Sequence, residues 1–271
     1  MVADTIQTSV GPVPVLHRLA LGVVLKDAMT DRIAVGPLRV GWEAEGHLLP
    51  RRSLPGWPCV DFEPVGTGRF RLRVTPRRPA LITVRIDDPS RRYVPRRLTI
   101  PLWTHDELTD PSPANQIAVR SRTVQVWLWP GAAYPFSSGT TFLRARVARL
   151  GRGVPWSRIV AISSIGTVLG RAHGDDRGEF VLPLADTAQN PLQSSVTVRL
   201  LVRGPNGPAE LPPPEVVARP ANPPVPGDLD NSVLRGLAPP SSLVPSIPPP
   251  PLFTVPVGQA YHPASDITFV P

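Results

Sequence analysis

The sequence is poor in cysteine and carries no signal for export. It has one cysteine, Cys59, so no internal disulfide can form, and it has no Asn-x-Ser/Thr acceptor for N-glycosylation. The segment from Met1 to Pro14 lacks a basic stretch followed by an apolar run, and no stretch reaches the ~18 apolar residues of a membrane span. We therefore expect a cytoplasmic protein.

Lysine is almost absent. The 29 basic residues include a single lysine, Lys26, and the net charge is +8. This imbalance is typical of a GC-rich genome, or of a basic surface that binds nucleic acid or an acidic partner. Aromatic residues make up 6% and do not interleave with the arginines, whereas single-strand binders need stacking rings. Among partners, the sequence favours an acidic protein over nucleic acid.

Motifs for chemistry are also missing. There is no Gly-x-Ser-x-Gly elbow, Walker loop or dinucleotide fingerprint. Cys59 follows a proline and precedes a valine, which indicates a buried structural thiol. The sequence therefore predicts no catalytic residue, no cofactor and no metal site. The histidines have no spacing that places two imidazoles on one metal; they are His17, His47, His105, His173 and His262.

Proline, by contrast, is abundant. Its 38 copies exclude long helices, because proline breaks helix interiors and central strands. Hydrophobic residues make up 41% and charged residues 18%, enough apolar content for packed cores. An all-β fold of short strands and many turns follows.

Alternation of apolar and polar residues places several strands. Leu19, Leu21, Val23 and Leu25 alternate with small or polar residues. In the segment 69–74 three arginines alternate with phenylalanine, leucine and valine, so the two kinds of side chain face opposite ways. A third strand is expected over 81–86, where turn-forming residues follow.

The same pattern recurs about 110 residues later, which predicts two copies of one β unit. Gly178–Leu184 resembles Gly68–Val74, and the segment 196–200 resembles the strand from Leu81. In both copies a glycine stands two residues before a phenylalanine. This spacing indicates a hairpin turn with positive φ followed by an aromatic core residue.

These patterns predict two tandem Ig-like or transthyretin-like β-sandwiches followed by an extended proline-rich arm. We assign residues 1–14 to an N-terminal extension, 15–103 to the first sandwich, 104–122 to a linker, 123–204 to the second sandwich and 205–271 to the arm. A strand over Val124–Leu128 is expected to lead into the second sandwich. The arm contains 19 prolines in 67 residues, which favours polyproline II over a core of its own.

Two sets of residues are candidates for partner binding. Trp127 and Trp129 either form an exposed docking face or cover the seam between neighbouring domains. The arm is either disordered or wraps a neighbouring subunit through apolar anchors. Its candidate anchors are Leu252, Phe253, Val255, Tyr261, Ile267 and Phe269.

One polar cluster spans His173–Glu179 and permits two interpretations. Its carboxylates and histidine are the residue types that hold a cation or transfer protons. Aspartate and glycine also concentrate in tight turns, and adjacent aspartates on an extended chain point apart. Because the spacing of a calcium loop is missing, the turn is the favoured interpretation.

The same cluster carries a family resemblance. The segment 170–182 (GRAHGDDRGEFVL) resembles the Gly-x-Ala-x-Thr-Asp-x-x-Gly-x-Phe-x-Leu signature of carboxypeptidase-regulatory-like domains, which are transthyretin-type β-sandwiches. Residues 144–162 resemble the two opening strands of that family, and 24–34 (VLKDAMTDRIA) is similar to its opening turn. Asp31 and Ala34 depart from the glycine and proline common there. The resemblance implies a seven- or eight-stranded accessory module without catalytic residues.

We therefore predict a non-enzymatic adaptor that acts through protein–protein contacts in a larger assembly, in several copies. The layout also resembles the cap or collar adaptors of phage-tail-like contractile injection systems, whose partners are sheath, tube or terminator proteins. The alternative is a carbohydrate- or peptide-binding module that stacks its ligand on Trp42, Trp57, Trp127 and Trp129. A third hypothesis is an enzyme or metal protein centred on His173, Asp175 and Asp176.

Overall fold

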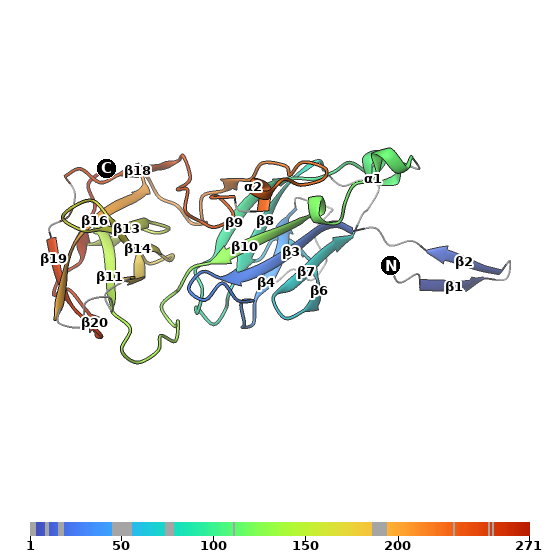
Figure 1. Ribbon diagram of the computed structural model, residues 1–271. Coiled ribbons are helices and arrows are strands. Elements are labelled where there is room, and N and C mark those ends of the chain that lie inside the picture. Colours follow the sequence, from blue (N-terminus) through green and yellow to red (C-terminus); the bar gives the residue numbers. More distant parts are fainter. Residues whose placement is uncertain are drawn as a thin grey trace.

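The computed structural model describes residues 4–8, 11–15, 19–44, 56–73, 79–110, 112–185, 194–229, 231–248, 250 and 252–271. Nearly all of its regular structure is β, as predicted: four sheets and a separate two-stranded hairpin. Figure 1 places two of the sheets, coloured mainly blue to green, beside the other two, coloured mainly yellow to red. We call these pairs of sheets the first half and the second half.

The first half contains two sheets whose side chains share one core. Val23 and Leu25 of one sheet and Val84 and Leu98 of the other belong to the same buried cluster. The smaller sheet has the order β10-β3-β7-β6, with β3 (Leu19–Asp27), β6 (Glu63–Gly66), β7 (Arg69–Arg73) and β10 (Thr123–Leu128). The larger has the order β17-β9-β8-β4-β5, with β4 (Arg39–Glu43), β5 (Cys59–Asp61), β8 (Leu81–Asp87), β9 (Arg96–Pro101) and β17 (Glu215–Val216).

The second half has the same general construction. Leu143 and Phe180 of one sheet share a buried cluster with Ile159 and Leu200 of the other. One sheet is built on β11 (Phe142–Arg149), which pairs with β12 (Arg152–Gly153), β15 (Glu179–Pro183), β20 (Ala260–Tyr261) and β21 (Ile267–Thr268). The other contains β13 (Arg158–Ile162), β14 (Val168–His173), β16 (Ser195–Pro205), β18 (Leu243–Pro245) and β19 (Leu252–Pro256).

The repeated glycine occupies equivalent places in the two halves. Gly68 and Gly178 have φ of +59° and +79°, which confirms the predicted positive φ. Their carbonyls accept the amides of Leu25 and Val147, each at 2.8 Å. A Cβ would lie 2.8 Å from the carbonyl oxygen of Ala34 at the first position and 2.5 Å from that of Val147 at the second. Any other residue would clash in both turns, which is the physical reason for the repeat.

Strand β10 corrects the predicted start of the second sandwich at residue 123. It pairs in parallel with β3, with Val124 opposite Val23 and Val126 opposite Leu25, and so belongs to the first half. The linker predicted over 104–122 precedes this strand and contains α1 (His105–Thr109) and two short 3-10 helices, Pro113–Asn115 and Arg120–Arg122. Alternation identifies a strand but not its neighbour, because the pairing joins residues about 100 positions apart.

Residues 205–271 also differ from the predicted extended arm. β17 pairs with β9, β18 and β19 pair with β16, and β20 and β21 pair with β11. The expectation that this segment has no core to enter is wrong, because Ile267 and Phe269 lie in the second core and Leu234 lies in the first. From β17 to β21 proline stands only at the last residue of β18 and of β19, so the other residues of these strands can form ladder hydrogen bonds.

The N-terminal extension forms a hairpin, β1 (Asp4–Thr8) and β2 (Gly11–Val15), which pair antiparallel. Figure 1 shows it extending away from the first half, beyond β6 and β7. Within the described residues its strands pair only with each other. A two-stranded hairpin alone is marginally stable in water, so this element gains most from a further strand.

Candidate functional site

The candidate site is the seam, where side chains of the first half contact the second half. On the first-half side it includes Arg91, Arg96 and Trp129, and on the second-half side Arg158, His173 and Asp175. Glu215 of β17 lies between them. The contacts between the two halves join residues that are far apart in the sequence, and all of these residues lie in the described part of the chain.

A buried carboxylate forms the centre of the seam. Glu215 accepts hydrogen bonds from Arg96 Nε at 3.1 Å and Nη2 at 2.6 Å, a bidentate pair. From the second half, Arg158 Nη2 donates to the same carboxylate at 3.1 Å. Arg96 is completely buried and Glu215 is 3% exposed. Because unpaired buried charges are costly, this shared carboxylate holds both arginines in place.

Backbone carbonyls complete the surroundings of Arg96. Its Nη1 donates to the carbonyls of Trp127 at 2.9 Å and Leu234 at 2.6 Å, and its Nη2 also donates to that of Val233. Arg158 has fewer partners. Burial, together with the nearby charge of Arg96, lowers the pKa of Arg158 to about 10, and the carboxylate of Glu215 opposes this shift. The guanidinium therefore stays charged at neutral pH.

An aromatic pair lies beside this network. The rings of Trp129 and His173 are stacked, and Trp129 Nε1 donates to the carbonyl of Arg235 at 2.9 Å. His173 Nε2 lies 2.9 Å from the carbonyl oxygen of Gly236, which only accepts, so this nitrogen carries the proton. Burial, reinforced by the charge of Arg158, holds the pKa of His173 well below its usual range. The imidazole is neutral at pH 7.

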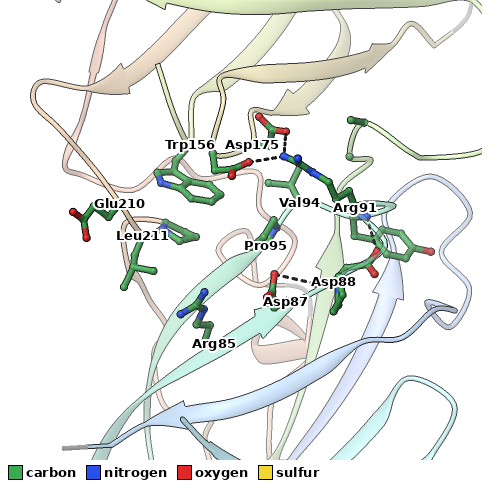
Figure 2. A pocket seen from close by; sticks show the side chains of 16 residues that line it. Arg85, Asp87, Asp88, Arg91, Val94, Pro95, Trp156, Asp175, Glu210 and Leu211 are labelled. Atoms are coloured by element: carbon green, nitrogen blue, oxygen red, sulfur yellow. Dashed lines mark hydrogen bonds and ion pairs between the residues drawn. The ribbon is translucent and has the colours of Figure 1, made fainter. Parts of the chain in front are cut away.

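The aspartates of the polar cluster form a turn and a salt bridge across the seam. Asp175 Oδ1 accepts the amides of Arg177 at 2.8 Å and Glu179 at 3.0 Å. From the first half, Arg91 Nη2 donates to Asp175 at 2.8 Å and to Asp176 at 2.6 Å. Figure 2 shows Arg91 pointing toward Asp175. Burial raises the pKa of Asp175, while those two amides and Arg91 oppose the shift. These contacts favour the turn over a metal or acid–base site.

A cleft of about 300 Å³ lies beside Arg91. Figure 2 shows Asp87 and Asp88 on its first-half side, with Trp156 and Glu210 across from them. Asp88 is already engaged: it accepts the backbone amides of Ser90 and Tyr93 and the Ser90 hydroxyl. The cleft therefore offers side chains of both charges, most of them committed to the fold.

Among the described residues, nucleophilic and metal-ligating side chains form no second site. Cys59 is 2% exposed, and burial raises the pKa of its thiol to about 12, so it is held as a thiol. In the described ranges, no group of three or more His, Cys, Asp or Glu side chains is placed to hold a metal ion. The longest α-helix among them, α1, has 5 residues, far fewer than the about 20 that cross a bilayer.

The predicted partner-binding residues separate into different surroundings. Trp127 and Trp129 are 7% and 8% exposed, and Trp129 lies in the seam as one of the two interpretations predicts. Phe269 is 1% exposed, and Phe253 and Tyr261 are half-buried. Val255 and Ile267 are buried too, so among the eight candidates only Leu252 is exposed. The structure brings Trp129 to His173 and does not gather the others.

The tryptophan rings form no open stacking surface. Trp42, Trp57 and Trp156 are also at most 8% exposed. Trp103 is half-buried, and the guanidinium of Arg219 lies 4.2 Å from its ring centroid. A sugar-binding platform needs exposed, clustered rings, and these rings are buried or covered.

Little in the sequence indicates the network of Arg96, Arg158 and Glu215. Glu215 is 119 positions from Arg96 and 57 positions from Arg158, and each arginine is one among many. One signal does exist: Glu215 is the only acidic residue between Glu210 and Asp228, in a stretch rich in proline. An isolated carboxylate among apolar residues indicates a buried, paired charge.

No family model and no curated protein matches the chain. Two solved structures are similar at 10% identity. The Bacillus anthracis TIE protein has a TM-score of 0.26 and is covered over 34% of its length by 93% of this chain. A streptococcal ancillary pilin has a TM-score of 0.23 and is covered over 62% of its length, again by 93% of this chain. The chain thus spans less than two thirds of either protein, and likeness of this degree assigns no family.

Proposed function

We propose that this chain is a non-enzymatic cytoplasmic adaptor that holds partner proteins at a fixed spacing within a larger assembly. The observation that carries the proposal is the buried carboxylate of Glu215, which binds Arg96 of the first half and Arg158 of the second. Relative motion is the default for neighbouring domains in one chain. Here it would separate buried charges, so the two halves act as one rigid spacer.

Contacts with partners come from strand edges in this proposal. β1 has an unpaired edge and contains no proline, whereas Pro12 and Pro14 of β2 lack the N–H that a strand ladder requires. The hairpin therefore accepts a partner strand on the β1 side by β-addition. Its position away from the first half leaves that side accessible (Figure 1).

The proposal also covers the architecture of the protein and the assembly in which it acts. We propose that each half is a transthyretin-type β-sandwich, which the Gly-x-Phe repeat and the shared cores favour. We also include the narrower setting, a cap or collar adaptor of a phage-tail-like contractile injection system. Its partners would then be several copies of sheath, tube or terminator proteins.

Rigidity is tested with spin labels on the two halves. Val65→Cys and Val168→Cys place labels on exposed positions of β6 and β14, while Cys59 is buried and does not react. Pulsed electron paramagnetic resonance should give one narrow distance distribution, which broadens in Glu215→Gln. The exposed Glu210→Gln is the matched control and should leave the distribution narrow. A broad distance distribution in the parent protein would contradict the proposal that the two halves form a rigid spacer.

The adaptor role is tested by purification from the native source. Tagged full-length chain should co-purify with other subunits at a constant stoichiometry, measured by light scattering and mass spectrometry. A chain without residues 1–18 should lose part of this assembly. If the full chain elutes as a monomer from its native source, the adaptor proposal fails.

A further inference from the structure

Three arginines lie in two neighbouring rows on one face of the sheet formed by β14, β13 and β16. Arg158 of β13 is opposite Arg203 of β16 and His173 of β14, and one row further Val160 is opposite Leu201 and Arg171. Intervening residues such as Ile159 and Val202 lie in the second core. The side chains of these two rows therefore face away from the core.

A segment from the first half's side of the seam closes one end of this face. Gly236, Leu237 and Pro239, together with the residues of the two rows, line a pocket of about 260 Å³. The carbonyl of Gly236 is fixed there by its hydrogen bond with His173. We call this the arginine pocket, lined by Arg158, Arg171 and Arg203 with Val160, Leu201 and Leu237.

Positive charge in the arginine pocket is not balanced. Arg158 shares the single carboxylate of Glu215 with Arg96, so two buried guanidinium groups have one carboxylate between them. Within the described part of the chain, the buried Nε of Arg158 has no hydrogen-bond partner, and Arg171 and Arg203 form no ion pair. Buried polar groups are normally satisfied, so an anion at this position would complete the surroundings of Arg158.

Several other sheet arginines of this protein have acidic partners. On β7, Arg71 and Arg73 both bind Glu63 of the neighbouring β6. On β9, Arg97 binds Glu43. The strands of the pocket face, β13, β14 and β16, contain no Asp or Glu at all. The face therefore has no carboxylate of its own to pair with Arg171 and Arg203.

We propose that the arginine pocket binds a carboxylate side chain from an acidic segment of a partner protein. The inference rests on the proposed adaptor function and names the chemistry of one of its contacts. Guanidinium groups hold carboxylates through paired, charge-assisted hydrogen bonds. Val160 and Leu201 add apolar surface beside them, which suits a protein segment. The lining offers no open aromatic ring for a nucleic-acid base, since His173 is stacked on Trp129.

A direct test is calorimetric titration of the full chain with a short blocked peptide of alternating glutamate and leucine. The same peptide with glutamine in place of glutamate should bind at least about tenfold more weakly, because it lacks the charge. Arg203→Gln and Arg171→Gln should each weaken binding of the glutamate peptide by about tenfold. Arg199→Gln is the matched control: it lies on the same face of β16 outside the pocket, and it should stay within about twofold.

Several results would overturn the inference. The inference fails if the glutamate peptide does not bind at millimolar concentration or if the glutamine peptide binds equally well. It also fails if Arg203→Gln binds the glutamate peptide as tightly as the parent protein does. Inorganic phosphate or an oligothymidylate that displaces the peptide at lower concentration would assign the pocket to phosphate instead. Thermal unfolding of each variant checks that it folds, and Arg203 is exposed, so its replacement leaves the cores intact.

Capture from the native source separates this inference from the adaptor proposal. If Arg203→Gln keeps all its stoichiometric partners and Arg171→Gln does too, the pocket makes no contact in the assembly while the adaptor role stands. If the parent chain has no stoichiometric partner, the adaptor role fails whatever the peptide does.

Discussion

The indole of Trp129 lies on the imidazole of His173, with ring centroids 4.9 Å apart and ring planes 24° from parallel. This stack joins the two halves, and the imidazole in it is buried and neutral. Its lowered pKa has a consequence for stability. In the unfolded chain the imidazole titrates near 6.5, whereas in the folded chain it resists protonation.

Stability should therefore fall in mild acid. Below pH 6.5 the unfolded state binds a proton that the folded state does not, so the contribution of His173 is complete above pH 6.5 and is lost as pH decreases. The free energy of unfolding should decrease by up to about 1.4 kcal/mol per pH unit through this group. Urea unfolding between pH 7.5 and 5 measures the slope.

The control is His173→Phe, which keeps an aromatic ring against Trp129 and removes the titration. Its absolute stability will differ because the hydrogen bond with Gly236 is lost, so the comparison uses the slope alone. The slope of the variant should be smaller between pH 6.5 and 5. Equal slopes in the two proteins would show that His173 is not the group responsible.

Removing the charge of Glu215 should destabilise the protein strongly. Glu215→Gln leaves Arg96 and Arg158 without their shared carboxylate in a buried site, and breaking a buried pair in this way costs about 3–5 kcal/mol. Glu210→Gln changes the same chemistry at an exposed position and should stay within about 0.5 kcal/mol of the parent. Denaturant midpoints at pH 7 give both values.

The two adjacent aspartates should behave differently. The carboxylate of Asp175 is 7% exposed and accepts two backbone amides and Arg91, so Asp175→Ala should cost about 1–3 kcal/mol. Asp176 is 56% exposed, and among the described residues its carboxylate binds only Arg91, so Asp176→Ala should cost about 0–1 kcal/mol. Similar losses in both variants, or release of a bound metal ion from either, would contradict the structural role of this turn.

Local patterns in the sequence predicted much of the fold. Strands β3, β7 and β8 follow the alternation that begins at Leu19, Arg69 and Leu81, and they start at those same residues. The turn glycines Gly68 and Gly178 were predictable because a positive φ imposes one residue type. Each of these features depends on neighbours within a few positions, which a sequence displays directly.

Long-range pairings were not predictable in the same way. The alternation at Val124 and Val126 is compatible with either half, and only the parallel pairing with β3 decides the outcome. Proline content near the C-terminal end predicted an extended arm, because strands of two to five residues are too short for alternation to stand out. The network of Arg96, Arg158 and Glu215 depends both on the pairing of β10 with β3 and on the pairing of the C-terminal strands, so the sequence could not locate it.

The last residues of the chain provide a sharp test of this correction. Phe269 is 1% exposed in the second core, and its backbone amide donates to the carbonyl of Ala148 at 2.8 Å. The next residue, Val270, is 45% exposed, and its contacts with Ser246 and Ile247 use the backbone. Replacing the side chain by alanine at these two positions therefore removes very different numbers of packing contacts.

Phe269→Ala should lower the free energy of unfolding by about 3–5 kcal/mol, because it removes a buried ring and leaves a cavity. Val270→Ala keeps the backbone hydrogen bonds and should change it by at most about 0.5 kcal/mol. Thermal and urea unfolding of the two variants beside the parent measure the difference. If Phe269→Ala unfolds like the parent, the C-terminal segment is a separate arm after all, because a ring outside the core contributes almost nothing to its stability.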